Sequence, residues 1–301
     1  MSDYVYASVS QLRDFLSGTN YSSSWTSDTA GLLRILRTAT TTIETYCGHN
    51  TFAPITATLD FDEGSGQLSD DTRPVLWNGQ RASKILLPWF VSMTSATLYT
   101  PDRSSSTALV ENTDYLSTPY AGFPPGMNAP YNGIKYKTTG SANENPFSES
   151  GQMVLALAAE WGYQDEKSTD STATTVSTTA STLTVASSTN LSAGQAILVD
   201  TERMLIESVT DATTIEVKRA IAGTTGATHS GATISIYQFP DSIVQACLEL
   251  SELSWIERGQ GLTETIDVAG TSISIPRSQK DQILQSIDMY ATFSANQAVI
   301  F

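Results

Sequence analysis

The chain has 301 residues, of which 40% are hydrophobic, and it carries a formal charge of −15 at pH 7. This length allows about two or three domains, each with its own core. The acidic balance argues against a protein that binds a nucleic-acid backbone through clustered Lys and Arg. Simple solubility is the first explanation of this charge, and the wall of a channel that repels DNA is the alternative.

No apolar run approaches the roughly 18 residues that a membrane-spanning helix requires, so no membrane partner is expected. The start, Met1–Tyr4, has neither a basic leader nor an apolar segment, and no signal peptide is predicted. We therefore expect synthesis in a cytoplasm, that of a bacterial host if the gene is viral. Cys47 and Cys247 fall in predicted helices, and in a cytosolic protein they are expected to be buried free thiols.

Residues 8–47 show two helical patterns. Ser8 and Gln11 have the spacing of a capping box, and Gly18 is a natural stop for the helix that follows Ser8. The second pattern repeats apolar residues over 32–47 and is closed by a glycine. Its Thr-rich part, 38–42, has low helix propensity, so tertiary packing must stabilise this helix.

The period of apolar residues changes to two from Phe52 onward, which predicts strands. Clusters of Gly, Pro, Asn and Asp, such as 62–71 and 122–133, separate these runs. Residues 51–165 are therefore predicted to form an antiparallel β-sandwich or barrel with long loops, and the sandwich is the fold that we expect. The run 155–160 fits a short helix on propensity, but we prefer a strand because the run leads into Trp161-Gly162-Tyr163.

Residues 166–180 are nearly all Ser, Thr, Asp and Ala, a composition typical of a linker. About five short apolar runs with turns between them follow, up to residue 238. This part predicts a second, small β module inserted into the rest of the chain.

The last part of the chain, 239–301, returns to a helical period. Pro240 suits the first position of a helix that ends near Gly259. Residues 261–275 predict either a hairpin or an extended arm that pairs with another subunit. Because one amphipathic helix cannot bury its apolar stripe alone, we predict an α+β fold in which both chain ends, 1–50 and 239–301, form a helical-bundle body that carries the two β insertions.

The usual signatures of catalysis and cofactor binding are absent from the sequence, and no enzyme, cofactor or metal site is predicted. The two histidines, His49 and His229, follow a helix-capping glycine and lie in a predicted turn, respectively. Trp89 and Phe90 fit core packing better than a binding platform. A solvated acidic loop is preferred over a Ca²⁺ site for the acidic side chains of one region: Asp60, Asp62, Glu63, Asp70 and Asp71. A spatially assembled carboxylate pair for glycoside hydrolysis stays open as a minor alternative.

Three stretches of the sequence resemble the head-to-tail connector, or adaptor, proteins of tailed bacteriophages. The first is Ile43-Glu44-Thr45-Tyr46-Cys47-Gly48 with the following Phe52-Ala53-Pro54, at the end of the N-terminal helices. The second is Glu160-Trp161-Gly162-Tyr163, and the third is Pro240-Asp241-Ser242-Ile243, which opens a helix that ends in Arg258. In simpler members the second stretch runs almost directly into the third, whereas here 166–238 intervene.

The resemblance implies a non-enzymatic structural protein of the virion neck, made in the host cytoplasm. Such adaptors form a ring, commonly a dodecamer, beneath the portal protein. The ring extends the DNA channel without sequence-specific binding and docks the tail or the next neck protein. Adaptors commonly insert C-terminal segments between portal subunits, which implies docking through six apolar residues here: Ile283, Ile287, Tyr290, Val299, Ile300 and Phe301.

Two alternatives stay open at this point. The apolar tip 299–301 could pack back onto its own subunit instead of the portal. The chain could also be a β-rich phage tail or surface protein that binds a carbohydrate or a host receptor, since Thr- and Ser-rich strands with exposed Tyr and Trp suit that role. A simple binding module would not need helices at both ends of the chain, which favours the adaptor.

Overall fold

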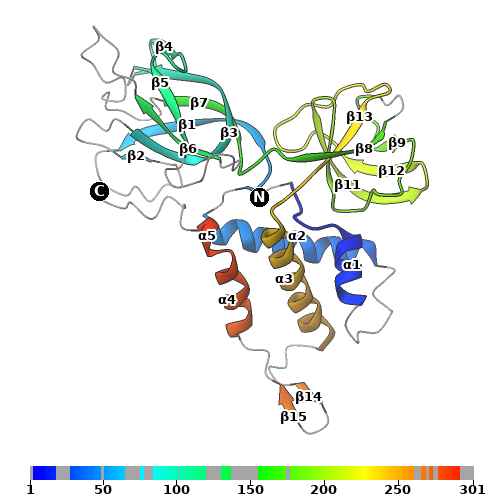
Figure 1. The fold of residues 1–301 in the computed structure, drawn as a ribbon. Coiled ribbons are helices and arrows are strands. Elements are labelled where there is room, and N and C mark those ends of the chain that lie inside the picture. The colour runs from blue at the N-terminus through cyan, green and yellow to red at the C-terminus, as the bar shows by residue number, and fades with distance from the viewer. Residues whose placement is uncertain are drawn as a thin grey trace. The chain divides into compact units, whose positions relative to one another are not determined.

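The computed structural model describes residues 3–17, 28–48, 51–64, 75–77, 84–100, 102–119, 130–136, 155–173, 177–260, 266–268, 271–273 and 277–291. The chain divides into two compact units (Figure 1). The first combines 1–49 with 166–293, and the described part of the second lies within Asn50–Asp165.

The predicted helical-bundle body is wrong. In the part of the chain that the structure describes, five helices account for 28% of the residues. The first unit contains a sheet of six strands, and the second contains a mostly antiparallel sheet of seven. Three of the helices are short, since α1, α4 and α5 have nine, ten and four residues. Helices of this size offer too little apolar surface to form a separate helical body, and strands supply most of the secondary structure of the described residues.

The helices begin where the sequence places capping groups. The backbone N–H of Ser8 donates to Gln11 Oε1 at 2.8 Å, and the N–H of Gln11 donates to Ser8 Oγ at 3.2 Å, which confirms the capping box. Asp28 caps the second helix by accepting from the N–H of Gly31 at 2.8 Å. The helices are α1 Val9–Ser17, α2 Thr29–Tyr46, α3 Asp241–Gln260, α4 Arg277–Ser286 and α5 Asp288–Ala291.

Helix α3 packs against three other helices, α1, α2 and α4. Apolar side chains around much of its circumference are therefore buried, including Ile243, Leu248 and Leu253. Cys247 is fully buried, with its Sγ 3.8 Å from Thr40 Oγ1 of α2. Cys47 and Cys247 are both buried free thiols, as predicted. Burial raises the pKa of each thiol to about 12, which keeps both thiols protonated at neutral pH.

The second unit contains one sheet in place of the predicted two-sheet sandwich. Its order is β2-β1-β7-β3-β6-β5, with β4 paired to β3; β2 runs parallel to β1 and the other pairs are antiparallel. The strand predicted at 155–160 is confirmed as β7, between β1 and β3. The strands are β1 Ile55–Gly64, β2 Val75–Trp77, β3 Lys84–Tyr99, β4 Ser106–Leu109, β5 Tyr115–Pro119, β6 Tyr131–Tyr136 and β7 Leu155–Trp161.

The first unit contains a small barrel of six strands in the order β8-β13-β10-β11-β12-β9. A bridge between Ala173 and Val185 joins its two outer strands, so the sheet closes on itself around buried side chains such as Leu183 and Ile197. The linker predicted at 166–180 is wrong for 167–172, which form β8. The strands are β8 Lys167–Thr172, β9 Thr182–Thr184, β10 Ala196–Val199, β11 Glu202–Asp211, β12 Thr214–Lys218 and β13 Thr233–Tyr237.

A separate hairpin connects α3 to α4. It consists of β14 Ile266–Val268 and β15 Thr271–Ile273, which pair antiparallel in a two-stranded sheet. Of the two alternatives for 261–275, the backbone therefore adopts the hairpin. No helix among the described residues has the length and apolar character that crossing a membrane requires.

Candidate functional site

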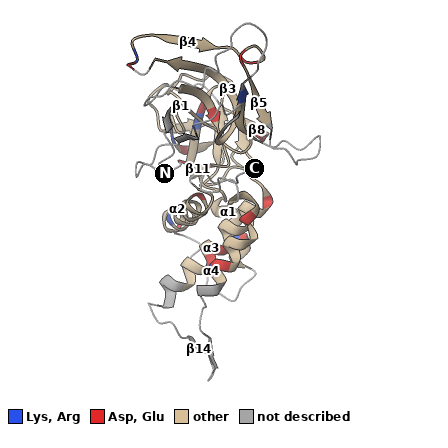
Figure 2. Ribbon diagram, turned by 90° about the vertical axis from the view of Figure 1, so that its left-hand side faces the viewer, with Lys and Arg blue, Asp and Glu red and all other residues tan. Residues whose placement is uncertain are grey.

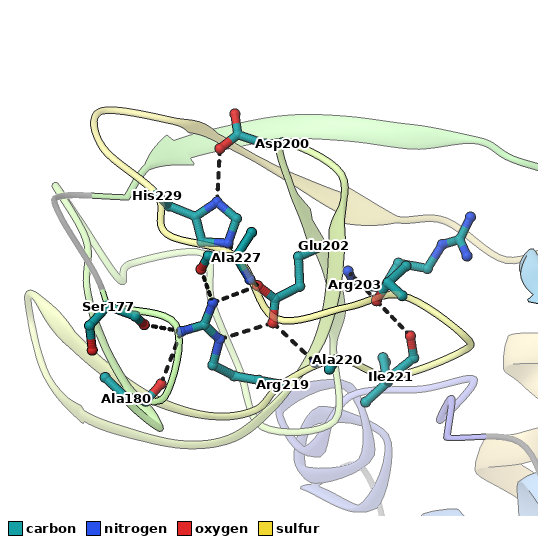
Figure 3. Close-up of polar contacts among 11 residues, drawn as sticks. Ser177, Ala180, Asp200, Glu202, Arg203, Arg219, Ala220, Ile221, Ala227 and His229 are labelled. Atoms are coloured by element: carbon teal, nitrogen blue, oxygen red, sulfur yellow. Dashed lines mark hydrogen bonds and ion pairs between the residues drawn. The ribbon is translucent and has the colours of Figure 1, made fainter.

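A cluster of buried charged side chains lies in the barrel and is centred on Glu202 at the start of β11 (Figure 3). Arg219 donates two hydrogen bonds to the fully buried Glu202 carboxylate, through Nε at 2.9 Å and Nη2 at 2.5 Å. The backbone N–H groups of Ala220 and Ala227 donate at 3.1 and 2.8 Å. His229 Nε2 lies 2.9 Å from the same carboxylate. Both oxygens of Glu202 are therefore held by donors from the segment that follows β12.

The cluster extends from Glu202 to two further parts of the barrel. His229 Nδ1 lies 2.8 Å from Asp200 Oδ2, in the turn between β10 and β11. The imidazole donates to both carboxylates at once only in its imidazolium form. Arg219 also donates to the carbonyl oxygens of Ser177 and Ala180, before β9. The buried side chains of Glu202, Arg219 and His229, with the half-exposed Asp200, thus tie three loops together.

The surroundings of Glu202 keep it ionised. Burial alone raises the pKa of this carboxyl group, because it disfavours the charged form. The hydrogen bonds from Arg219, Ala227 and His229 outweigh burial and lower the pKa to about 2. Because the side chain is fully buried and its acceptor positions are occupied, it has no lone pair left for a substrate. The geometry indicates a carboxylate that organises loops.

The loop after β12 has a strained backbone that this cluster stabilises. Ala220 and Ala222 have φ values of 54° and 52°, in the left-handed region that alanine rarely adopts. Lys218 Nζ lies 2.5 Å from Asp3 Oδ1, and the N–H of Ala222 donates to Asp3 Oδ2 at 3.5 Å. The loop is therefore bonded to the N-terminal segment of the chain through Asp3.

We call residues 3–8 the strap, because they connect the barrel to the helices. Residues 4–8 are only 1–3% exposed. The Tyr4 ring packs against Tyr237 at the end of β13, with a centroid distance of 5.8 Å. The Tyr6 ring packs against Phe239, just before α3, at 4.9 Å. The strap is therefore in contact with the segment that leaves the barrel.

The other contacts of the strap reach α2 and return to the barrel. The Tyr6 hydroxyl donates to Glu44 at 2.7 Å, and the N–H of Tyr6 donates to Thr40 Oγ1 at 3.2 Å. The N–H of Val9 then donates to the carbonyl of Ala193 in the barrel at 2.9 Å. Because the strap is bonded to both parts, it fixes the barrel to α2 within the first unit.

In the second unit, two of the stretches that carry the adaptor resemblance lie side by side. The N–H of Tyr163 donates to the carbonyl of Thr51 at 3.0 Å. The rings of Phe52, Trp89 and Tyr163 pack together with centroid distances of 5.1–5.7 Å. We call these three rings the clasp. It holds together the two ends of the second unit, where the chain enters and leaves.

Gly162 allows the close approach of backbones at the clasp. A Cβ atom at this position would lie 2.7 Å from the carbonyl oxygen of Ala53. We expect Gly162→Ala to destabilise the second unit by about 1–3 kcal/mol, because neither backbone can move away without breaking the sheet pairing. Hydrogen exchange of the β1 and β7 amides measures the effect.

Gly231→Ala is the matched control for Gly162→Ala. A Cβ atom there meets nothing within 4 Å, although φ is +65°. The control should cost about 1–2 kcal/mol in the first unit, where a left-handed alanine is strained, and leave the second unit unchanged. Unchanged exchange of β1 and β7 in Gly162→Ala would show that the close approach does not matter.

Three of the six residues predicted to dock on the portal lie in the described part of the chain, and the other three lie outside it. Ile283, Ile287 and Tyr290 are 6%, 0% and 7% exposed, so in the single chain they are buried. The Tyr290 hydroxyl lies 3.2 Å from Ser242 Oγ of α3. Val299, Ile300 and Phe301 lie outside the described residues. The three placed residues hold α4 and α5 on the chain instead of forming an exposed surface.

The remaining candidates from the sequence offer no reactive group in the described residues. Trp89 and Phe90 are buried, as core packing predicts. Asp60 lies 3.7 Å from Arg103, and the side chains of the other acidic residues in its region, like His49, lie outside the described part. No three or more His, Cys, Asp and Glu among the described side chains are arranged to hold a metal ion.

Sequence reasoning missed the Glu202 cluster. The interpretation of His229 as a turn residue overlooked its buried ring, which lies between two carboxylates. The sequence did contain one signal. Arg219 and His229 flank a Gly- and Thr-rich segment, and two acidic residues, Asp200 and Glu202, lie at a turn between the preceding strands. That pattern fits charges that converge when the barrel closes.

Comparisons of the chain with protein-family models, with curated proteins and with solved structures gave no match.

Proposed function

We propose that the chain is a structural virion protein, a head-to-tail adaptor that forms a ring beneath the portal, extends the DNA channel and docks the tail or the next neck protein. The observation that supports this most directly concerns the two β parts of the chain, the barrel and the sheet of the second unit. In each of them the segment that enters and the segment that leaves lie side by side. In the barrel the N–H of Gln238 donates to the carbonyl of Glu166 at 2.9 Å, and in the second unit the clasp holds the entering and leaving segments together.

This arrangement makes both β units insertions between α2 and α3, which contact each other directly. Insertions of this kind leave the helices free to pair while the β units present surfaces to other proteins. The strap adds rigidity, since it bonds the barrel to α2. A rigid connection suits a protein that carries load between a head and a tail, and the charge of −15 suits a wall past which DNA slides.

Docking on the portal is assigned to the segment after α5. The buried side chains of Ile287 and Tyr290 anchor α5 on the chain, so the segment that follows starts from a fixed point. Burial of the apolar tip 299–301 between portal subunits would contribute on the order of 1.5–3 kcal/mol for each fully buried side chain, before ordering costs. Repetition around a ring would turn a small gain per copy into strong attachment.

Co-sedimentation with tail-less, DNA-filled heads tests this function. The full chain should sediment with heads that contain portal and stay in the supernatant with portal-free capsids. Deletion of 298–301 should weaken attachment sharply while leaving the melting temperature nearly unchanged. Equal attachment of the deletion variant would contradict portal docking by the tip, and a trimer with glycan affinity that ignores heads would contradict the adaptor function itself.

A further inference from the structure

One face of helix α2 consists of side chains that are exposed or half-exposed in the described part of the chain. The buried side chains of the helix, such as Leu32, Leu36 and Ile43, point to the core of the first unit. On the other side, residues at helical spacing are exposed or half-exposed: Ala30, Arg34, Arg37, Thr38, Thr41 and Thr45. We call these six residues the α2 face.

The threonines of the α2 face do not need water as a hydrogen-bond partner. The hydroxyls of Thr38, Thr41 and Thr45 each donate to the backbone carbonyl four residues earlier, at 2.8–3.0 Å. Threonine is also a poorer helix former than the Lys, Glu and Gln that serve a solvent-exposed helix surface. The result is a flat helix surface without long side chains apart from two arginines.

Charge distinguishes the α2 face from the opposite side of the helices. Arg34 and Arg37 are the exposed charges of α2, and both are basic in a chain with 31 acidic and 16 basic residues (Figure 2). On α3, Asp241 and Glu249 lie on one face with Gln245, at steps of four residues. Gln245 donates to Glu249 at 2.7 Å. We call Asp241, Gln245 and Glu249 the α3 stripe.

We propose that the α2 face of one copy binds the α3 stripe of a second copy, head to tail. This rests on the proposed function and adds to it the surfaces that build the ring. Since α2 buries its apolar side toward α3, its exposed face points away from the α3 stripe of the same chain. Two different surfaces on opposite sides generate a heterologous contact, which closes into a ring when the rotation permits.

The electrostatics favour this partner over solvent. Arg37 lies 3.6 Å from Glu207 of the barrel, but both side chains are about half exposed, and such surface pairs are weak. Two arginines on one copy can therefore turn to two carboxylates on the next. We choose a second copy of this chain as the partner because every copy carries an α3 stripe whose carboxylates complement the arginines of the α2 face.

Charge reversal tests the proposal. Sedimentation velocity of the full chain at rising concentration should show self-association. The double variant Arg34→Glu/Arg37→Glu and the double variant Asp241→Arg/Glu249→Arg should each weaken it by about tenfold or more. A mixture of the two variants should regain association, with the two variants alternating. The reversed α2 face of one variant is complementary to the reversed α3 stripe of the other, and the two unreversed surfaces stay complementary to each other.

Arg103→Glu is the control, since Arg103 is an exposed arginine of the second unit, and it should leave association unchanged. A wild-type chain that stays monomeric at its highest soluble concentration, reversed variants that associate like the wild type, or a mixture that associates no better than either variant alone would each overturn the proposal. Helical circular dichroism must stay unchanged for a variant to count. If these faces mediate self-association but the protein ignores portal-containing heads, the adaptor function fails and this inference stands.

Discussion

Replacement of Glu202 with Gln is expected to destabilise the barrel by about 3–5 kcal/mol, because it leaves the buried Arg219 without its counter-charge. The substitution also places an amide N–H₂ against donors from His229 and the backbone of Ala227, so hydrogen bonds are lost as well. Native-state hydrogen exchange of the β10–β12 amides in the full chain measures the change.

Glu207→Gln on the same strand is the matched control for Glu202→Gln. Glu207 is about half exposed and pairs with Arg37 at 3.6 Å, so its replacement should cost at most about 1 kcal/mol. If the two substitutions have equal effects, the Glu202 cluster does not stabilise the barrel in the way its geometry indicates.

The same carboxylate gives the barrel a defined pH dependence. The folded pKa of Glu202 is about 2, below its ordinary value of 4.5. A depressed folded pKa contributes stability that is fully present above 4.5 and is lost as the pH falls toward 2. We expect the wild-type barrel to lose stability over this window, and the Glu202→Gln variant to lose less over the same window.

Replacement of Tyr6 with Ala is expected to cost about 3–5 kcal/mol, because it removes a 1%-exposed ring that packs on Phe239. It also removes the hydroxyl that donates to Glu44 on α2. The effect should be shared by α2 and the barrel, since the strap is bonded to both. Hydrogen exchange should therefore speed up in both parts and stay unchanged in the second unit.

Tyr6→Phe separates the two contributions of this side chain. It keeps the ring contact and loses only the hydroxyl bond to Glu44, so it should cost about 1–3 kcal/mol. An effect of Tyr6→Ala confined to α2, with the barrel unchanged, would show that the strap does not fix the two together.

Some elements of this fold could be predicted because their signals are local. The capping box at Ser8 and Gln11 needs only four residues of sequence, and the burial of Cys47 and Cys247 follows from residue type. Strand β7 was predictable because its apolar run ends in Trp161-Gly162-Tyr163. These inferences needed no knowledge of distant parts of the chain.

Other elements depended on contacts between distant residues. Strand β8 has the composition of a linker, and all six of its residues are exposed or half-exposed. It is a strand because it pairs with β13 and because the bridge at Ala173 follows it. The Glu202 cluster forms only when the barrel closes. The helical body was overestimated because periodic helices stand out in a sequence, whereas many short strands together build the larger part of the fold.

A reconstruction of the virion neck tests the central claim most directly. The account predicts a ring of density directly beneath the portal into which the helices of this chain and both β units fit, with the α2 face of each copy against the α3 stripe of the next. Assignment of the chain to a tail fibre, a tail tip or the capsid surface, with no copy in contact with the portal, would contradict the account.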